Sequence, residues 1–73
     1  MSNKKGLPIA AMERLLRDFT GFRISEGAKM ALKQEMERHG EAIAERAARC
    51  SQHAGRKTIM EDDIKLVIKE MNL

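Results

Sequence analysis

The residues best suited to binding an anion stand together in one short stretch, residues 53–63. Arg56 and Lys57 are adjacent cations there, and the hydroxyl of Thr58 follows them directly. Two cations and a hydroxyl can neutralise a phosphate group and donate hydrogen bonds to it, which is how proteins contact a nucleic-acid backbone. A basic pair is also common in solvated turns, so the stretch by itself leaves both interpretations open.

Signals for a helix end and a helix start enclose this stretch. Gly55 can adopt the left-handed conformation that commonly ends a helix, and His53 would lie favourably among the last free carbonyls. Thr58 and Glu61 have the spacing of a capping box, in which each side chain accepts a hydrogen bond from the other residue's backbone N–H. We therefore predict that one helix ends near Ala54 and that another begins within a residue or two of Thr58.

The chain begins with a short lead and a short helix. Residues 1–6 include two lysines and are expected to form a flexible basic lead. Apolar residues at helical spacing predict a helix over residues 8–18, opened by Pro8, whose missing N–H costs nothing in a first turn. Glu13 and Arg17 form an i,i+4 pair that supports this helix.

A much longer helix follows. Residues 20–24 interrupt the helical pattern, and Ser25 is the expected N-cap of a helix that runs without a proline to residue 54. This central helix has about 29 residues, or about 43 Å at 1.5 Å per residue. Residues 61–71 repeat apolar side chains at helical spacing and predict a third, short helix. We thus expect an all-α fold of short, long and short helices in a single domain over residues 7–73.

The length of the central helix predicts a second chain. A compact domain of this size has a diameter of about 30 Å, so two short helices cannot cover the apolar stripe of the long one. Gly40 lies near the midpoint, where glycine costs about 1 kcal/mol relative to alanine unless another backbone approaches closely. We predict a two-fold homodimer whose central helices cross near this glycine. The predicted interface residues are Leu32, Met36, Gly40, Ile43 and Ala47.

Length and composition narrow the class of protein. A chain of 73 residues forms one domain at most, and a core of that size is marginally stable without a disulfide, a metal or a partner. The single cysteine excludes an internal disulfide and suits a reducing compartment. No secretory signal or membrane-spanning stretch is visible, so we expect a cytoplasmic protein without a membrane partner.

The charge balance and the aromatic content favour one kind of nucleic acid. Fourteen Lys and Arg residues against eleven Asp and Glu residues give a formal net charge of +3, which permits an acidic partner and doubles in a homodimer. With no Trp or Tyr and only two Phe residues, the chain lacks the aromatic platforms on which single-stranded bases stack. A duplex is the expected target if nucleic acid binds.

The sequence shows no pattern typical of catalysis. It lacks a nucleophile and base at matching positions, a glycine-rich phosphate loop and a pair of carboxylates placed for a cleft. Cys50 and His53 could begin a metal site, with His39 or a second chain adding ligands, but a structural zinc site needs four closely spaced ligands. Packing is the favoured role for Cys50, and a packed or solvent-edge position is favoured for His39 over a role as a ligand or pH switch. We predict no enzymatic activity, metal, cofactor or small-molecule substrate.

Several short motifs, taken together, resemble those of archaeal-type histones, the minimal and tail-less members of the histone-fold family. The resemblance spans Leu7 to about Met71, and it is specific because the motifs flank a central helix of this length. It rests on Leu7-Pro8-Ile9-Ala10, Arg14, Arg23-Ile24-Ser25, His53-Ala54-Gly55-Arg56-Lys57-Thr58-Ile59 and Asp63-Ile64.

The resemblance implies a head-to-tail handshake homodimer in which the first loop of one chain meets the second loop of the other. Family members insert the first-loop arginine at the minor groove, a role that maps to Arg23. They hold phosphates with the second-loop lysine and threonine, which map to Lys57 and Thr58. Paired first helices would add a contact through Arg14 and Arg17.

Three further features have expected roles, and the last two of them have counterparts in the family. The N-terminus of the central helix, marked by Ser25, should offer backbone amides to phosphate, and Arg56 and Asp63 resemble the family's internal ion pair. The region of the family's dimer-to-dimer contact maps to Cys50, His53 and Asp63. Cys50 stands where members usually carry a larger aliphatic residue, so the stacking of dimers into tetramers or fibres stays open.

These observations predict an architectural protein that binds double-stranded DNA with little regard for sequence. It would compact, bend or coat DNA as a dimer through phosphate and minor-groove contacts, in association with the nucleoid or chromosome. The alternative is a histone-fold interaction subunit that heterodimerises within a larger assembly. Such subunits need not keep the loop cations, and the presence of Arg14, Arg23, Lys57 and Thr58 together favours DNA.

Overall fold

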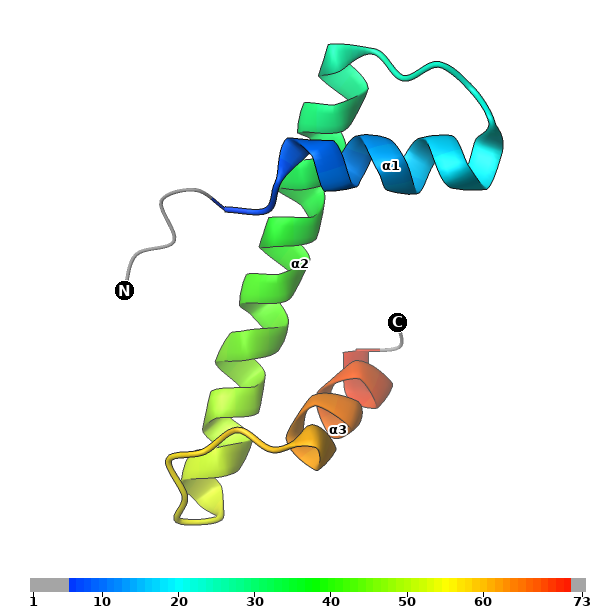
Figure 1. The fold of residues 1–73 in the computed structure, drawn as a ribbon. Coiled ribbons are helices and arrows are strands. Elements are labelled where there is room, and N and C mark those ends of the chain that lie inside the picture. Colours follow the sequence, from blue (N-terminus) through cyan, green and yellow to red (C-terminus); the bar gives the residue numbers. More distant parts are fainter. Residues whose placement is uncertain (1–5, 72–73) are drawn as a thin grey trace. The chain divides into compact units, whose positions relative to one another are not determined.

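A computed structural model describes residues 6–71, which form three α-helices joined by two loops (Figure 1). They are α1 (Ile9–Thr20), α2 (Glu26–His53) and α3 (Glu61–Met71), and no strand occurs among the described residues. The predicted all-α order of short, long and short helices is confirmed, and α3 has the predicted bounds. The predicted lead, except for Gly6, lies outside the described residues.

The ends of α1 differ slightly from the prediction. Pro8 is the N-cap of the helix, with φ −66° and ψ 133°, and its carbonyl accepts hydrogen bonds from the N–H groups of Ala11 and Met12 at 3.2 and 3.4 Å. The helix therefore begins one residue later than expected and continues to Thr20. It ends at Gly21, whose φ of 74° places it in the left-handed region that a glycine adopts without strain.

Both ends of α2 follow local signals. At the start, the Ser25 hydroxyl oxygen accepts the N–H of Ala28 at 3.1 Å, which confirms the predicted N-cap. At the end, Gly55 has φ 73° and donates its N–H to the Gln52 carbonyl at 2.9 Å, while Arg56 donates its own to the Ser51 carbonyl at 2.9 Å. This is a Schellman motif, which satisfies two carbonyls that the helix end would otherwise leave free.

The predicted capping box at the start of α3 was wrong. The helix begins at Glu61, so the N-cap position belongs to Met60, two residues beyond Thr58. The Met60 N–H donates to a carboxylate oxygen of Asp63 at 2.7 Å. Glu61 instead pairs with Lys65 at 2.6 Å on the helix surface. The capping carboxylate thus comes from the third helical residue, as in a capping box, but two residues further along the chain than predicted.

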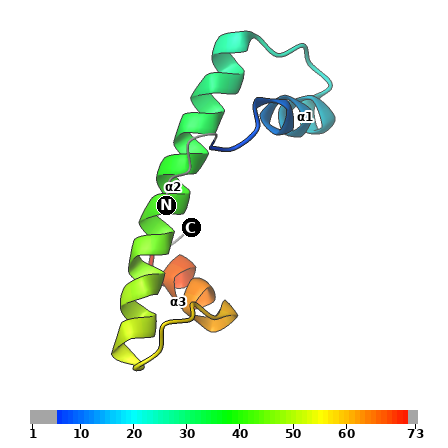
Figure 2. The same ribbon diagram turned by 60° about the vertical axis from the view of Figure 1, so that its left-hand side comes forward.

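The chain divides into two compact units, residues 1–38 and 39–73, each of which contains part of α2. In the first unit, α1 lies beside the N-terminal part of α2 (Figures 1 and 2). The largely buried Lys29 joins them, because its ammonium lies 3.3 Å from Glu13 of α1 and 2.8 Å from Glu26. The hydrogen bond to Glu26 is the main cause that raises the pKa of Lys29 above its ordinary value, and the hydrogen bond to Glu13 adds to this effect.

A second polar contact secures the segment before α1. The Glu37 carboxylate accepts the backbone N–H of Leu7 at 2.7 Å and pairs with Lys33 at the same distance. The hydrogen bond from Lys33, supported by that from the Leu7 N–H, lowers the pKa of Glu37. The expected surface pair of Glu13 and Arg17 is also present, at 3.2 Å.

In the second unit, α3 lies beside the C-terminal part of α2 (Figures 1 and 2). Val67 of α3 and Ala47 of α2 are fully buried there. The prediction that the two short helices cannot cover the apolar stripe of the central helix was therefore wrong at Ala47, because α3 lies beside this part of α2. Of the other residues predicted at the dimer interface, Met36 and Gly40 are exposed, and Leu32 and Ile43 are half-buried.

More large apolar side chains are exposed than buried among residues 6–71. The buried hydrophobic residues are Met12, Ala47 and Val67. Two residues of α1, Leu15 and Phe19, are 51% and 90% exposed. The other exposed large apolar residues are Phe22, Met30, Met36, Ile59, Met60 and Leu66. A chain with so little apolar surface buried by its own helices is expected to bury the rest against a partner.

Candidate nucleic-acid interface

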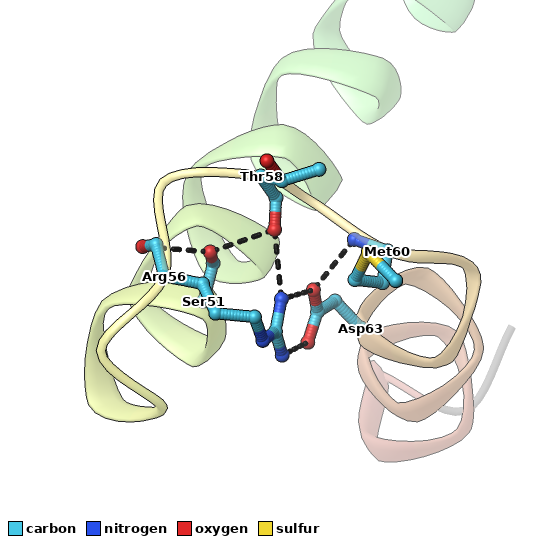
Figure 3. A network of polar contacts seen from close by, with 5 residues as sticks. All are labelled: Ser51, Arg56, Thr58, Met60 and Asp63. Carbon is cyan, nitrogen blue, oxygen red and sulfur yellow. Dashed lines mark hydrogen bonds and ion pairs between the residues drawn. The ribbon is translucent and has the colours of Figure 1, made fainter.

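The loop between α2 and α3 is fixed by a polar network centred on Arg56 and Asp63 (Figure 3). The guanidinium makes two parallel bonds to the carboxylate, Nη1 to Oδ2 at 3.1 Å and Nη2 to Oδ1 at 3.2 Å. Such fork-to-fork pairing is both strong and directional. Because the carboxylate of Asp63 also caps α3 through Met60, one buried side chain joins the loop to the start of the helix.

The ion pair favours the charged form of both Arg56 and Asp63. The hydrogen bond from Arg56, reinforced by the Met60 N–H, lowers the pKa of Asp63 below its ordinary value of 3.8. The same hydrogen bond raises the pKa of the Arg56 guanidinium. Both groups therefore stay charged throughout the neutral range, and the loop keeps its geometry there.

Ser51, in the last turn of α2, is a second centre of the network and was missed by the sequence reasoning. Its side chain is almost fully buried, and its hydroxyl lies 3.0 Å from the Arg56 carbonyl and 2.9 Å from the Thr58 carbonyl, which share its single proton. The Thr58 carbonyl also accepts a bond from Arg56 Nη1 at 2.7 Å. Its position in the sequence could have indicated this burial, because Ser51 follows Ala47 by four residues and so continues the buried face of α2.

The network faces inward and leaves the binding groups in solvent. The carbonyl of Thr58 points into the network, while its side chain lies on the opposite side of the backbone (Figure 3). Thr58 and Lys57 are both exposed. Within the described part of the chain, no hydrogen bond or ion pair engages the Lys57 ammonium. A fixed backbone with an available cation and hydroxyl can bind an anion at little cost in ordering.

The loop between α1 and α2 carries the other predicted contact. Arg23 is exposed there, two residues before the N-cap Ser25. On α1, Arg14 is exposed, whereas Arg17 is 55% exposed and partly occupied by its pair with Glu13. An exposed pair of this kind contributes little free energy, so Arg17 can exchange its carboxylate for another anion.

The predicted site residues fall into the two units. Arg14, Arg17, Arg23 and Ser25 belong to the first, and Lys57 and Thr58 belong to the second. The polar network brings together Arg56, Asp63 and the backbone of Thr58 within the second unit. The expected meeting of Arg23 with the second loop involves a partner chain and stays a prediction.

The residues mapped to a contact between dimers have different environments. His53 is exposed and Cys50 half-buried, beside an open depression of about 330 Å³ that both line. Asp63 is already paired with Arg56.

Among residues 6–71, no group of three or more His, Cys, Asp or Glu side chains is arranged to hold a metal ion. None of the three helices is both long and apolar enough to cross a membrane.

Comparison with known proteins agrees with this architecture. Residues 5–68 match the family described as histone-like transcription factor (CBF/NF-Y) and archaeal histone. The chain is also 38% identical over 63 residues to one subunit of the archaeal histone HAN1 of Thermococcus zilligii, a match that covers 86% of this chain and 94% of that protein. These two matches agree with the all-α order of short, long and short helices. The chain therefore belongs to the histone-fold family of archaeal histones and histone-like transcription factors.

Proposed function

We propose that this protein is an architectural DNA-binding protein that acts as a homodimer on double-stranded DNA with little sequence preference. Arg23 would reach the minor groove, Lys57 and Thr58 would hold phosphates, and Arg14 and Arg17 would add contacts from α1. The amides at the start of α2, next to Ser25, would add donors toward phosphate. Binding of this kind compacts, bends or coats DNA. Its place in the cell would be the cytoplasmic nucleoid or chromosome.

The observation that carries this proposal is the form of the second loop. Ser51, Arg56 and Asp63 hold its backbone through buried and half-buried bonds, while Lys57 and Thr58 keep their side chains in solvent. A loop held in this way keeps its exposed cation and hydroxyl in a fixed position, which lowers the ordering cost of binding a phosphate. Family membership supports the same reading, because archaeal histones share this fold.

The electrostatics predict how such binding would depend on salt. Each phosphate neutralised by a lysine or arginine releases counterions, so the logarithm of affinity falls by about 0.9 per contact for each tenfold rise in salt. Phosphate contacts carry no sequence information, which accounts for the expected tolerance to sequence. In a two-fold dimer every residue contributes twice, so the loss of one lysine removes two contacts.

Mobility shifts and salt titrations with duplex DNA test the proposal directly. Lys57→Ala should lower the salt slope by about 2 and weaken binding about 10- to 100-fold near 0.1 M salt. Arg23→Ala should weaken binding to a similar extent. The matched controls are Lys69→Ala and Arg38→Ala, which remove one exposed cation each outside the proposed site.

Two outcomes distinguish an error in the assigned site residues from an error in the proposed function. If the two loop variants bind as tightly as the control variants, the assignment of Arg23 and Lys57 is wrong. If the intact protein fails to shift duplex DNA even at low salt, the DNA-binding function itself is wrong.

One observation favours a second candidate, an interaction subunit that pairs with a different histone-fold chain. The relative from Thermococcus zilligii is named as a subunit. Light scattering of the purified chain distinguishes the two. A stable homodimer supports the first proposal, whereas a monomer or aggregate that becomes a defined dimer only with a second histone-fold chain supports the other.

A further inference from the structure

Both aromatic side chains of this protein are exposed. Phe19, in the last turn of α1, has a relative exposure of 90%, and Phe22, in the following loop, has one of 71%. The chain contains no Trp, no Tyr and no third Phe. Aromatic side chains usually supply much of the buried apolar surface of a small domain. Two of them left in solvent therefore call for surfaces that cover them.

The two phenylalanines stand in different settings. Phe19 continues the apolar stripe of α1, four residues after Leu15, which is itself 51% exposed. A second chain packed on that stripe would cover both, as the proposed dimer requires. Phe22 is not part of a helix, and it stands between the exposed residues Gly21 and Arg23. The exposure of Phe22 is therefore not explained by an apolar stripe along a helix.

The backbone that carries Phe22 is held by local hydrogen bonds. Gly21 donates its N–H to the Arg17 carbonyl at 2.7 Å, in the left-handed conformation that ends α1. The Thr20 hydroxyl donates to the Leu16 carbonyl at 2.7 Å and accepts the N–H of Phe22 at 3.1 Å. Phe22 thus has an ordered backbone before any partner binds, which lowers the cost of using its side chain in an interface.

The charge next to Phe22 indicates which surface covers it. Arg23 follows it directly, with a Cα atom about 3.8 Å away, so a groove that admits the arginine lies within reach of the phenylalanine. Arg14 and Arg17 add exposed positive charge on the preceding helix. An apolar protein pocket gains nothing from these charges, whereas the DNA minor groove attracts them. Architectural proteins insert apolar side chains between base steps from that groove.

We propose that Phe22 is an apolar wedge for duplex DNA. When Arg23 enters the minor groove, the side chain of Phe22 inserts at the neighbouring base step, partly unstacks it and bends the duplex toward the major groove. This inference rests on the proposed DNA-binding function and deepens it, because it selects bending over passive coating. Pyrimidine–purine steps such as TA unstack most easily, so the wedge would favour them. A dimer would carry two wedges, one on each first loop.

A duplex of about 25 base pairs, labelled with a dye pair at its ends and with 2-aminopurine beside a central TA step, tests the wedge. The intact protein should raise the 2-aminopurine fluorescence several-fold and shorten the end-to-end distance, as unstacking and bending do. Phe22→Ala should abolish the fluorescence rise and reduce the bend while weakening affinity less than about tenfold, because the phosphate contacts remain. Phe22→Leu, which keeps an apolar wedge, should restore most of the signal.

Lys69→Ala is the control, since it removes an exposed side chain of α3, outside the first loop. Measured per bound duplex, it should keep the fluorescence rise. The wedge is refuted if the intact protein binds without unstacking the TA step, or if Phe22→Ala keeps the signal. Light scattering that finds Phe22→Ala monomeric would also refute it, by placing Phe22 in the dimer interface. No binding by the intact protein is a separate result, which overturns the proposed function.

Discussion

A single carboxylate, that of Asp63, performs two tasks in the second loop. It pairs with both terminal nitrogens of Arg56 and caps α3 through the N–H of Met60. The side chain is buried, so both contacts are partly shielded from water. Asp63 therefore couples the geometry of the loop to the start of the helix, and its protonation state affects both.

This coupling predicts an acid-dependent stability. The pKa of Asp63 is lower in the folded chain than its ordinary value of 3.8, so the unfolded chain binds a proton more readily. The contribution of Asp63 is therefore present above about pH 4 and is lost as the pH falls through the folded pKa. Thermal unfolding from pH 7 to pH 3 should show a falling melting temperature at the acid end.

Asp63→Asn provides the comparison. It should melt at a lower temperature than the original protein at pH 7 and should lose less stability between pH 5 and pH 3. Some acid dependence should persist, because Glu37 also has a lowered pKa, caused by Lys33 and then by the Leu7 N–H. An unchanged acid profile in Asp63→Asn would show that the carboxylate does not stabilise the fold through its charge.

At the scale of elements, the last turn of α2 and its loop behave as one piece. Ser51 belongs to the helix, yet its hydroxyl donates to the carbonyls of Arg56 and Thr58 beyond the helix end. Gly55 makes this possible, since its φ of 73° turns the chain back over the helix end. The exposed cation and hydroxyl of the loop are thus positioned from beneath by a buried helix residue.

Ser51→Ala tests this junction. It removes the hydroxyl from two carbonyl acceptors in a nearly fully buried position, so it should lower the free energy of unfolding by about 1–2 kcal/mol. Denaturant unfolding measures the change. Lys57→Ala, an exposed substitution on the same loop, should stay within about 0.5 kcal/mol of the original protein. Equal stability of Ser51→Ala and the original protein would mean that water replaces the hydroxyl without loss.

The same junction explains where local reasoning about α3 succeeded and failed. Apolar spacing gave the bounds of the helix, because periodicity reports which residues share a buried face. The spacing of Thr58 and Glu61 gave the wrong cap, because the carbonyl of Thr58 is held by Ser51 and Arg56 in the preceding network. A helix start at Glu61 then leaves Asp63 to cap Met60.

At the scale of the whole molecule, the exposed apolar surface is the main argument for a second chain. Phe19 and Leu15 of α1 and Met36 of α2 are exposed, while few large side chains are buried among residues 6–71. Ala47 needs no second chain to cover it, because it is already buried within its own chain. The proposed interface therefore depends more on α1 and the exposed part of the α2 stripe.

Gly40 gives this proposal a sharp test. A Cβ atom at this position would meet nothing within 4 Å in the single chain, so alanine should stabilise a lone helix by up to about 1 kcal/mol. If a second backbone crosses there, Gly40→Leu should instead weaken dimerisation. Sedimentation and the dependence of the unfolding midpoint on protein concentration report the dimer. A folded monomer in the original protein, or unaltered dimerisation of Gly40→Leu, would contradict the crossing.

The sequence by itself determined the features that depend on neighbouring positions. The three helices, the Ser25 cap, the left-handed Gly55 and the pair of Glu13 and Arg17 follow from residues within about four positions of one another. Short-range hydrogen bonds and side-chain spacing act on that scale, so they can be read from the chain. The loop motifs also pointed to the histone-fold family, which the comparisons confirm.

Only the tertiary structure decided which side chains lie beneath the functional loop. The burial of Ser51 and its contact with the Thr58 carbonyl seven residues later, the covering of Ala47 and the bridge from Lys29 to Glu13 all join separate segments. Such contacts depend on how helices pack, and packing is set by many side chains at once. The sequence named the cation and hydroxyl of the loop, and the packing of α3 beside α2 determined what holds them in place.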